Sequence, residues 1–344
     1  MKKTVGVGTL ILLLLITGCA TSVRMVVTKP AEVNLAGVKN LSILDFEYVE
    51  STSEVTLDKL LEDALSQLIT GEDTSLSNEE KMARYATNKM SESLAATDYF
   101  TLVDPGNFKD SVDIMTNRMQ FFDILSGVYD VDGVLLGSIL TMKTKETWET
   151  RIVMVLDELT GQEVEQEEEW VTRQANLEFE YRILSTDTSE VMVQKVFTRS
   201  TSDAKSYEEY DRLTSEDLMY KRMVDEIVRT ITRQLVPYQV TESRSLMKDK
   251  TKDQRMETAD QFVKVAKYNE ALEIFLSVWQ QTRNIAAGFN AAIMYEALGN
   301  LDQAIVQMND VLNVYPEKKV FRSLERLKAA KVEREKAMAQ LEGR

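Results

Sequence analysis

The pattern of apolar and polar positions predicts alternating helices and strands in the middle of the chain and helices alone in its last third. Apolar residues three or four positions apart indicate amphipathic helices over residues 56–69, 78–96, 108–125 and 215–235. Runs rich in β-branched and aromatic residues indicate strands over residues 40–46, 99–103, 133–140, 148–156, 168–181 and 191–198. Asn78 is expected to cap the second of these helices. Residues 40–242 are therefore predicted to form one α/β domain.

The last third of the chain contains an internal repeat in residues 256–316, in which small and aromatic residues recur with an offset of 33 positions. The first copy contributes Ala259, Phe262, Ala266, Tyr268, Ala271 and Phe275, and the second contributes Ala292, Tyr295, Gly299, Ala304 and the closing Pro316. The pattern resembles two tetratricopeptide repeats, whose small residues let paired helices approach closely. Two repeats bury little surface alone, so residues 317–344 are predicted to form a capping helix and tail. Phe321, Leu324 and Leu327 are expected on the inner side of that helix, and residues 243–255 are expected to form a linker.

The first residues of the chain have the form of a targeting signal. Lys2 and Lys3 precede an apolar run that ends in Gly18 and Cys19, and Cys19 is the single cysteine of the chain. The run is shorter than the roughly 20 apolar residues that a membrane-spanning helix needs. It resembles the signal peptide of a bacterial lipoprotein, which would occupy residues 1–18 and be cleaved after Gly18.

This resemblance implies that acyl chains such as palmitate are attached to Cys19 and that residues 19–39 form a lipidated tether. Two or three acyl chains anchor a protein firmly, where one chain would not. Ala20 stands where an aspartate commonly marks retention in the inner membrane, so the resemblance implies the outer membrane, on its periplasmic face. A plain signal peptide with an incidental cysteine is the alternative.

Three segments of the middle domain resemble the signatures of the curli-secretion lipoprotein family. They are LSILDF at residues 41–46, FTLVD at residues 100–104 and VDGVLLGSI at residues 131–139. The resemblance implies an α/β sandwich-type periplasmic domain, and a generic α/β domain is the alternative. The expected fold class is thus α+β, with this domain followed by an all-α tetratricopeptide-repeat module.

Members of that family that form a secretion channel contribute membrane-spanning hairpins, and one segment of this chain argues against that role. Residues 162–169 read QEVEQEEE near the tip of the predicted hairpin. Carboxylates are costly inside a hydrocarbon core. The sequence therefore favours a relative of the family that does not form the channel.

Composition narrows the function further. The chain has no histidine and one cysteine, which excludes the Ser-His-Asp and Cys-His nucleophile systems and the usual zinc sites. With 41 basic and 56 acidic residues the formal net charge is -15, which disfavours nucleic acid as a partner. We expect no enzymatic activity, no cofactor and no metal site.

The expected function is that of a non-catalytic, membrane-anchored scaffold in the bacterial envelope. The lipid on Cys19 would bind the membrane, and the repeat module would bind an envelope protein through its groove. The alternative is a subunit of an oligomeric envelope secretion or assembly complex related to the curli channel. Formation of a homo-oligomer stays open.

Overall fold

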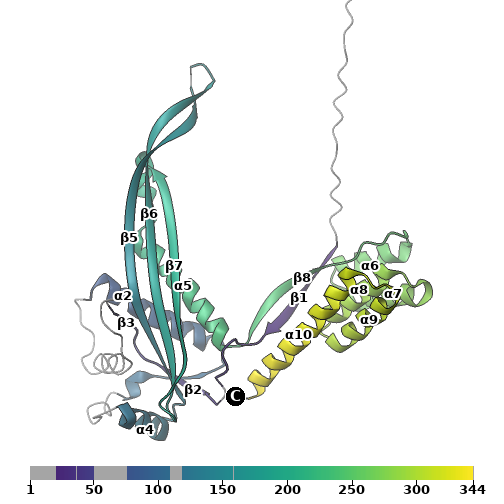
Figure 1. Ribbon diagram of the computed structural model, residues 1–344, viewed down its shortest axis with the longest axis horizontal. Coiled ribbons are helices and arrows are strands. Elements are labelled where there is room, and N and C mark those ends of the chain that lie inside the picture. The colour runs from purple at the N-terminus through teal and green to yellow at the C-terminus, as the bar shows by residue number, and fades with distance from the viewer. Residues whose placement is uncertain (1–20, 36, 50–75, 109–117, 158, 344) are drawn as a thin grey trace, which may run out of the picture. The chain divides into compact units, whose positions relative to one another are not determined.

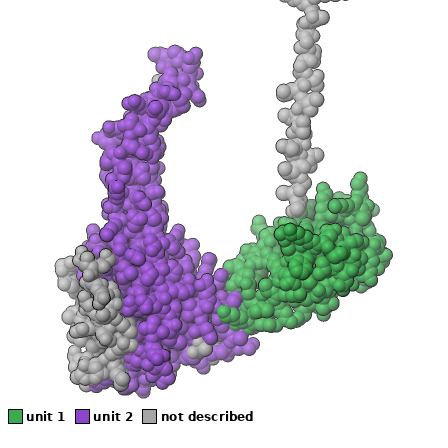
Figure 2. All heavy atoms as spheres, in the orientation of Figure 1, with its two compact units in different colours: residues 1–29, 239–336 green, residues 30–238, 337–344 purple. Residues whose placement is uncertain are grey.

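The computed structural model describes residues 21–35, 37–49, 76–108, 118–157 and 159–343. These residues form two compact units (Figure 2): unit 1 contains the residues up to Lys29 together with Gln239–Lys336, and unit 2 contains Pro30–Tyr238 and the residues from Ala337 onward. The expected α+β class is confirmed at this level, because a sheet domain is followed by a helical segment (Figure 1). Cys19, Gly18 and the helix expected over residues 56–69 lie outside the described residues.

Unit 2 is built on a six-stranded sheet. Its strands are β2 (Asn40–Ile43), β3 (Glu47–Tyr48), β4 (Thr101–Val103), β5 (Gly133–Leu156), β6 (Glu163–Ser185) and β7 (Val191–Ser206). The strand order is β4-β2-β5-β6-β7, with β3 paired to β5. Strands β2, β4 and β5 are parallel, whereas β5, β6 and β7 form an antiparallel meander. The helical segments are α2 (Asn78–Ala95), η1 (Pro105–Phe108), α4 (Arg118–Tyr129), η2 (Tyr207–Arg212) and α5 (Glu216–Leu235).

Helices cover both faces of this sheet near its parallel end. On one face, α2 and α5 bury a long apolar stripe against sheet residues such as Leu177, Phe179 and Ile183. On the other face, Phe121 and Phe122 of α4 pack against the residues of β5 and β6 that point the opposite way. Because residues along a strand alternate between faces, the same strands supply both cores.

The meander is longer than the sequence pattern predicts. Strand β5 was expected as two strands, over 133–140 and 148–156, but it runs without interruption for 24 residues. The connecting residues contain no glycine or proline and are rich in threonine, which favours strand, and all of them pair with β6. The strand expected over 168–181 is the centre of the longer β6, and the strand expected over 191–198 is the first half of the longer β7.

Two helix boundaries also differ from the prediction. Ser77, and not Asn78, caps α2: its Oγ accepts a hydrogen bond from the N–H of Glu80, whose carboxylate accepts one from the N–H of Ser77. Of the residues expected as a helix over 108–125, Phe108 belongs to η1 and residues 118–125 belong to α4, which continues to Tyr129, whereas residues 109–117 lie outside the described residues.

Unit 1 combines a two-stranded sheet with a row of helices. The strands are β1 (Ser22–Lys29) and β8 (Tyr238–Ser245), and the helices are α6 (Gln254–Lys264), α7 (Tyr268–Thr282), α8 (Ile285–Ala297), α9 (Leu301–Val314) and α10 (Lys318–Glu342). Helices α6, α7 and α8 each pack against the helix that follows, and β1 contacts α6 and α8. Val23 and Met25 of β1 and Leu246 after β8 are buried in the helical core.

The boundaries expected for the tether and the linker need correction. Residues 19–39 are not one tether, because Ser22–Lys29 is strand β1 of unit 1 and Pro30 begins unit 2. The linker expected over 243–255 begins inside β8 and ends inside α6. Alternating apolar residues in β1 give it a face to bury, which a free tether would not have.

The two helix pairs have matching turns. The turn between α6 and α7 places Ala266 at φ +58°, and the turn between α8 and α9 places Gly299, 33 positions later, at φ +78°. The same hydrogen bond closes both turns: the N–H of Lys267 donates to the carbonyl of Phe262 (2.9 Å), and the N–H of Asn300 donates to that of Tyr295 (2.8 Å). The offset found in the sequence therefore corresponds to equivalent backbone geometry.

The left-handed conformation at these two turns predicts opposite effects of two substitutions. A side chain with a Cβ is strained there by about 1 kcal/mol, whereas glycine is not. Ala266→Gly should raise the free energy of unfolding by a few tenths to about 1 kcal/mol, and Gly299→Ala should lower it by about 1 kcal/mol. Chemical denaturation of both variants measures this, and a change of the same sign in both would contradict the assignment of equivalent turns.

Candidate functional site

The backbone that follows β8 lies along α8 and is held there by a buried asparagine. Asn290 is 1% exposed. Its Oδ1 accepts a hydrogen bond from the Met247 N–H (2.7 Å), and its Nδ2 donates one to the Met247 carbonyl oxygen (3.0 Å). One side chain thus satisfies both backbone polar groups of Met247.

A buried carboxylate holds the same segment three residues earlier, at Arg244. Glu296 of α8 is 6% exposed and accepts hydrogen bonds from Arg244 Nε (3.0 Å) and from the Arg326 guanidinium (2.7 Å to Nη2). Arg244 also pairs with Glu242, which pairs in turn with Lys29 Nζ at 3.0 Å. Strands β1 and β8 and helices α8 and α10 are therefore joined by one charge network within unit 1.

The titration of two members of this network reflects those contacts. The hydrogen bond to Glu333, and then those to Glu242, raise the pKa of Lys29 against the effect of its burial. Burial acts to raise the pKa of Glu242, but hydrogen bonds from Arg244 and Lys29 outweigh it, and the pKa is lowered. Both shifts favour the charged forms, so the network is present at neutral pH.

The third contact lies at the start of α8. Asn284 Nδ2 donates to Asp249 Oδ1 (2.8 Å) and Thr251 Oγ1 (3.0 Å), while Asn284 Oδ1 caps α8. Burial opposes the ionised form of Asp249, but hydrogen bonds from Asn284, Thr251 and the Asp253 N–H lower its pKa. The chain after β8 is thereby fixed until α6 begins.

These contacts show that an extended segment runs antiparallel along α8. Arg244, Met247 and Asp249 meet Glu296, Asn290 and Asn284 in reverse order. Twelve helical residues rise about 18 Å, and five extended residues span about 17 Å. Because these two lengths match, residues 244–249 follow α8 over its length and cover one side of the row of helices.

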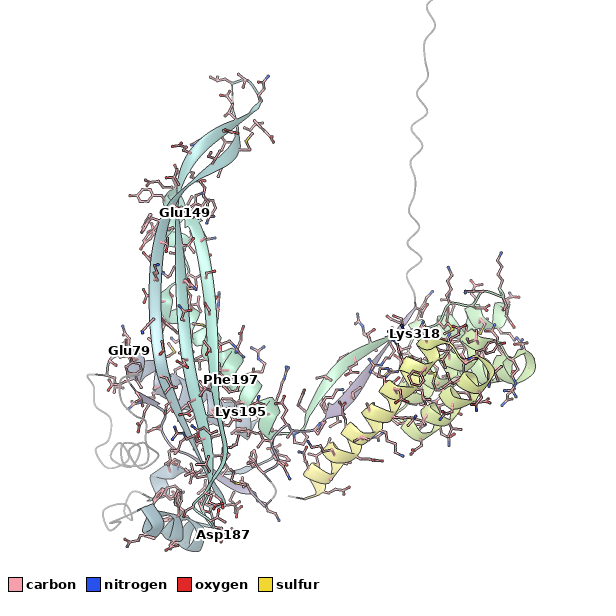
Figure 3. The ribbon with its side chains drawn as sticks, viewed as in Figure 1. Glu79, Glu149, Asp187, Lys195, Phe197 and Lys318 are labelled. Atoms are coloured by element: carbon pink, nitrogen blue, oxygen red, sulfur yellow. The ribbon has the colours of Figure 1, made fainter. Side chains whose placement is uncertain are left out.

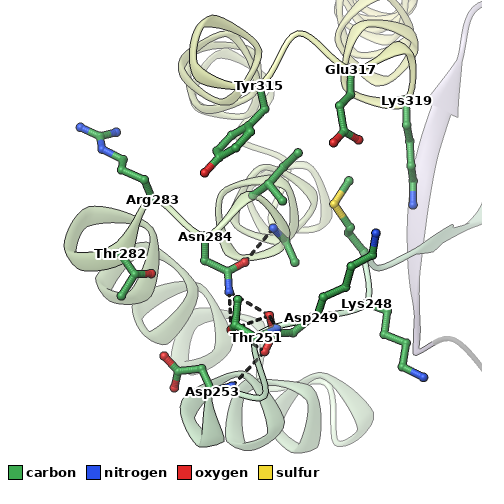
Figure 4. A pocket seen from close by; sticks show the side chains of 14 residues that line it. Lys248, Asp249, Thr251, Asp253, Thr282, Arg283, Asn284, Tyr315, Glu317 and Lys319 are labelled. Carbon is green, nitrogen blue, oxygen red and sulfur yellow. Dashed lines mark hydrogen bonds between the residues drawn. The ribbon is translucent and has the colours of Figure 1, made fainter.

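A pocket of about 690 Å³ opens where this segment ends. Residues 247–251 and Asp253, the turn between α7 and α8, and Tyr315, Glu317 and Lys319 line it. Figure 4 shows Tyr315 and Glu317 across the opening from the hydrogen-bonded group of Asn284, Thr251 and Asp249. Polar and apolar groups both line the pocket, and its carboxylates other than Glu317 are engaged by neighbouring donors.

In unit 2 the prominent surface is the end of the β5–β6 hairpin beyond the last residue pair of β6 with β7, which is Trp170 with Ser206. This projecting ribbon, residues 149–169, extends from the sheet in Figure 1, and Glu149 marks its base in Figure 3. The pairs Ile152–Glu167, Met154–Glu165 and Leu156–Glu163 face one another. Directly opposite residues lie on the same face.

One face of the ribbon therefore carries an apolar row on β5 beside an acidic row on β6. Ile152 is 68% exposed and Met154 is 57% exposed. Exposed apolar side chains in such a row mark an interaction surface. The sequence analysis singled out the acidic run but missed the apolar row, because its partners are set only by the register of β5 and β6.

The residues predicted for the repeat core differ in burial. Fully buried are Ala259, Ala271, Phe275, Ala292 and Ala304, whereas Phe262, Tyr268 and Tyr295 are half-buried and Gly299 and Pro316 lie in exposed turns. On α10, Leu324 and Leu327 face inward as expected, but Phe321 is 53% exposed. Val320 takes the inner position, because it lies four and seven residues before the other two.

Two further features bear on function. Within the described ranges, no three His, Cys, Asp or Glu side chains gather closely enough to hold a metal ion. No helix in the described part of the chain combines the length and apolar character that a membrane span requires.

Neither a protein-family model nor a curated protein matches the chain. The PelC dodecamer from Paraburkholderia phytofirmans is similar in fold, with 11% identity, a TM-score of 0.26, and 62% of this chain and 97% of that one covered. Lipoprotein GNA1162 from Neisseria meningitidis is similar with 9% identity, a TM-score of 0.25, and 56% and 97% covered. A putative neuraminyllactose-binding hemagglutinin homolog from Helicobacter pylori shows 10% identity, a TM-score of 0.31, and 60% and 90% covered. These are distant likenesses.

Asn290→Ala should loosen the segment along α8. It leaves the N–H and carbonyl of Met247 without partners, which costs about 1–3 kcal/mol for each buried group. Hydrogen exchange at the Met247 amide should become faster, and the free energy of unfolding should fall. Asn313→Ala, at an exposed position of α9, is the control. Unchanged protection of the Met247 amide would show that Asn290 does not hold the segment.

Proposed function

We propose that the protein is a non-catalytic bacterial envelope lipoprotein, anchored through Cys19, that binds a protein partner through the projecting ribbon of unit 2. The apolar row beside an acidic row on one face of this ribbon carries the proposal. The apolar residues in this row of the ribbon are exposed. They therefore add nothing to the core on either face of the sheet of unit 2.

The repeat groove that the sequence suggested as the docking surface is a weaker candidate. Strands β1 and β8 and residues 246–249 already cover part of the row formed by α6 and α8. A partner peptide would have to displace a segment that belongs to the same chain. Such a segment competes at a high effective concentration.

The ribbon favours a partner with a basic rim and an apolar centre. Its acidic row holds Glu163, Glu165 and Glu167, and its apolar row lies one strand away. Electrostatic complementarity of this kind speeds association and weakens with salt. An anchored partner would also meet the ribbon at a raised local concentration.

Self-assembly is the second candidate. Among the described residues, no strand pairs with the outer edge of β7, and the outer edge of β5 is unpaired beyond Ile139. Unpaired strand edges are templates for pairing with another chain. A second copy of the chain is therefore an alternative occupant of this sheet.

The anchor is tested by Cys19→Ser. The variant should leave the membrane fraction or accumulate as an uncleaved precursor, because hydroxyl oxygen is a far weaker nucleophile than thiolate. Fractionation of cells with immunodetection measures this. A variant that matures normally and still sediments with membranes would refute the assignment of Cys19.

The ribbon is tested by placing a photo-crosslinking residue at Met154 in intact cells. We expect a discrete adduct that is lost when Glu163, Glu165 and Glu167 are changed to Gln. The same crosslinker at Val306, which is 62% exposed on α9, is the control. An adduct of twice the chain mass identifies a second copy as the partner, and a Met154 profile equal to that of Val306 contradicts the proposal.

A further inference from the structure

One end of unit 1 gathers basic side chains although the chain as a whole is strongly acidic. The 690 Å³ pocket and an adjoining groove on α10 share Lys319, and together they are lined by seven cations and three carboxylates. Among the described residues, no carboxylate pairs with five of these exposed cations, which are Lys248, Lys250, Lys318, Lys319 and Arg322. We call these five residues the basic end of unit 1.

The placement of two of these lysines is unfavourable for the helix that carries them. Lys318 and Lys319 open α10, and its first turn contains no acidic residue. The N-terminus of a helix is electropositive, so cations there are disfavoured and carboxylates are preferred. Glu317, directly before the helix, is the carboxylate nearest to them in the sequence, and helix stability alone gives no reason for the two lysines.

An aromatic side chain lies among the same cations. Phe321 is 53% exposed, and it lies on α10 one turn after Lys318 and directly before Arg322. Positions three and four apart share a helix face. Basic residues around an exposed aromatic ring are typical of surfaces that enter the headgroup region of a bilayer.

The start of β1 lies at the same end of unit 1. The Leu246 N–H donates a hydrogen bond to the Thr21 carbonyl oxygen (2.9 Å), and the following residues, Met247 and Lys248, line the pocket together with Lys319. Figure 3 shows Lys318 beside the start of β1.

The length of chain before β1 limits how far unit 1 can be from the lipid. Only Ala20 and Thr21 separate Cys19 from Ser22, and Val23 is fully buried in unit 1. Three residues span at most about 10 Å. Acyl chains on Cys19 therefore hold this end of unit 1 against the bilayer.

We infer that the basic end of unit 1, with Phe321, is a membrane-contact surface that binds anionic phospholipid headgroups. The inference rests on the proposed anchor for its orientation, but the binding itself needs only the side chains. Lys and Arg ammonium and guanidinium groups hydrogen-bond headgroup phosphates. The surface thereby adds a second attachment to the lipid and fixes which side of unit 1 faces the membrane.

The net charge of the chain does not prevent this contact. At physiological ionic strength, charges farther than about 8 Å from a surface are largely screened, so the local patch determines the attraction. Within the patch, Asp253 is paired with Arg255, and Asp249 accepts hydrogen bonds from Asn284 and Thr251. The cations there have fewer such partners.

The test uses the chain from Ala20 to Arg344, which lacks the acylated cysteine and contains every residue that the structure describes. Binding is measured by co-sedimentation with vesicles of phosphatidylcholine, with and without phosphatidylglycerol. We expect binding only with phosphatidylglycerol and weaker binding at high salt. Each basic residue near an anionic bilayer contributes about a fivefold factor in affinity. The triple variant Lys318→Gln, Lys319→Gln, Arg322→Gln should therefore bind on the order of 100-fold more weakly.

The matched control removes three exposed lysines from other parts of unit 1, through Lys264→Gln, Lys267→Gln and Lys336→Gln. It should bind nearly as well as the parent chain. Absence of binding, or an equal loss in both triple variants, overturns the inference. So does patch-dependent binding of an acidic peptide without vesicle binding, which would assign the surface to a protein. Fractionation of Cys19→Ser in cells is independent, so failure of the vesicle test leaves the anchor standing.

Discussion

Unit 1 depends on the contact between α8 and the extended segment that follows β8. Two helix pairs bury too little surface to be stable alone, since about three repeats are usually needed. Here Val23 and Met25 of β1 and Leu246 after β8 supply the missing apolar cover, and Asn290 and Glu296 supply the polar partners that an extended backbone and its arginine require. The polar groups are as important as the apolar ones, because buried amide and carboxylate groups without partners would destabilise the unit.

A covering segment from the same chain has a further consequence. It comes from both ends of unit 2, since β1 precedes Pro30 and β8 follows α5. Unit 1 is therefore completed only after Pro30–Tyr238 of unit 2 has been synthesised. A repeat module with a free groove is able to bind a peptide from another molecule. In this protein the α8 side of the helices is already covered by a segment of the same chain. The pocket lies at the end of this covering segment.

The sequence predicts helices better than it predicts long strands or the roles of single residues. Repeat helices were found because residues such as Ala271 and Ala304 recur with a fixed offset, and both are buried. The prediction of a tether over residues 19–39 was wrong, because the eight residues of β1 carry no local signal of their partner strand. That strand, β8, lies more than 200 residues away. Asn290 and Glu296 could not be recognised as buried from sequence, because polar residues inside a helix normally face water. On α10, Val320 faces inward where the sequence pattern predicts Phe321. The two residues are adjacent, so a rotation of the helix by one position exchanges them.

Charge distribution, and not net charge, defines which partners this protein can bind. A formal charge of -15 suggests one acidic surface with one class of basic partner. The structure instead places an acidic row on the ribbon of unit 2 and five cations without a carboxylate partner at the basic end of unit 1. Each cluster lies in a different unit, and salt screens charges over about 8 Å, so the local charge of each surface determines its attraction for a partner. The acidic row is therefore able to bind a basic partner, and the basic end of unit 1 is able to bind an acidic one. The net charge of the chain describes neither surface.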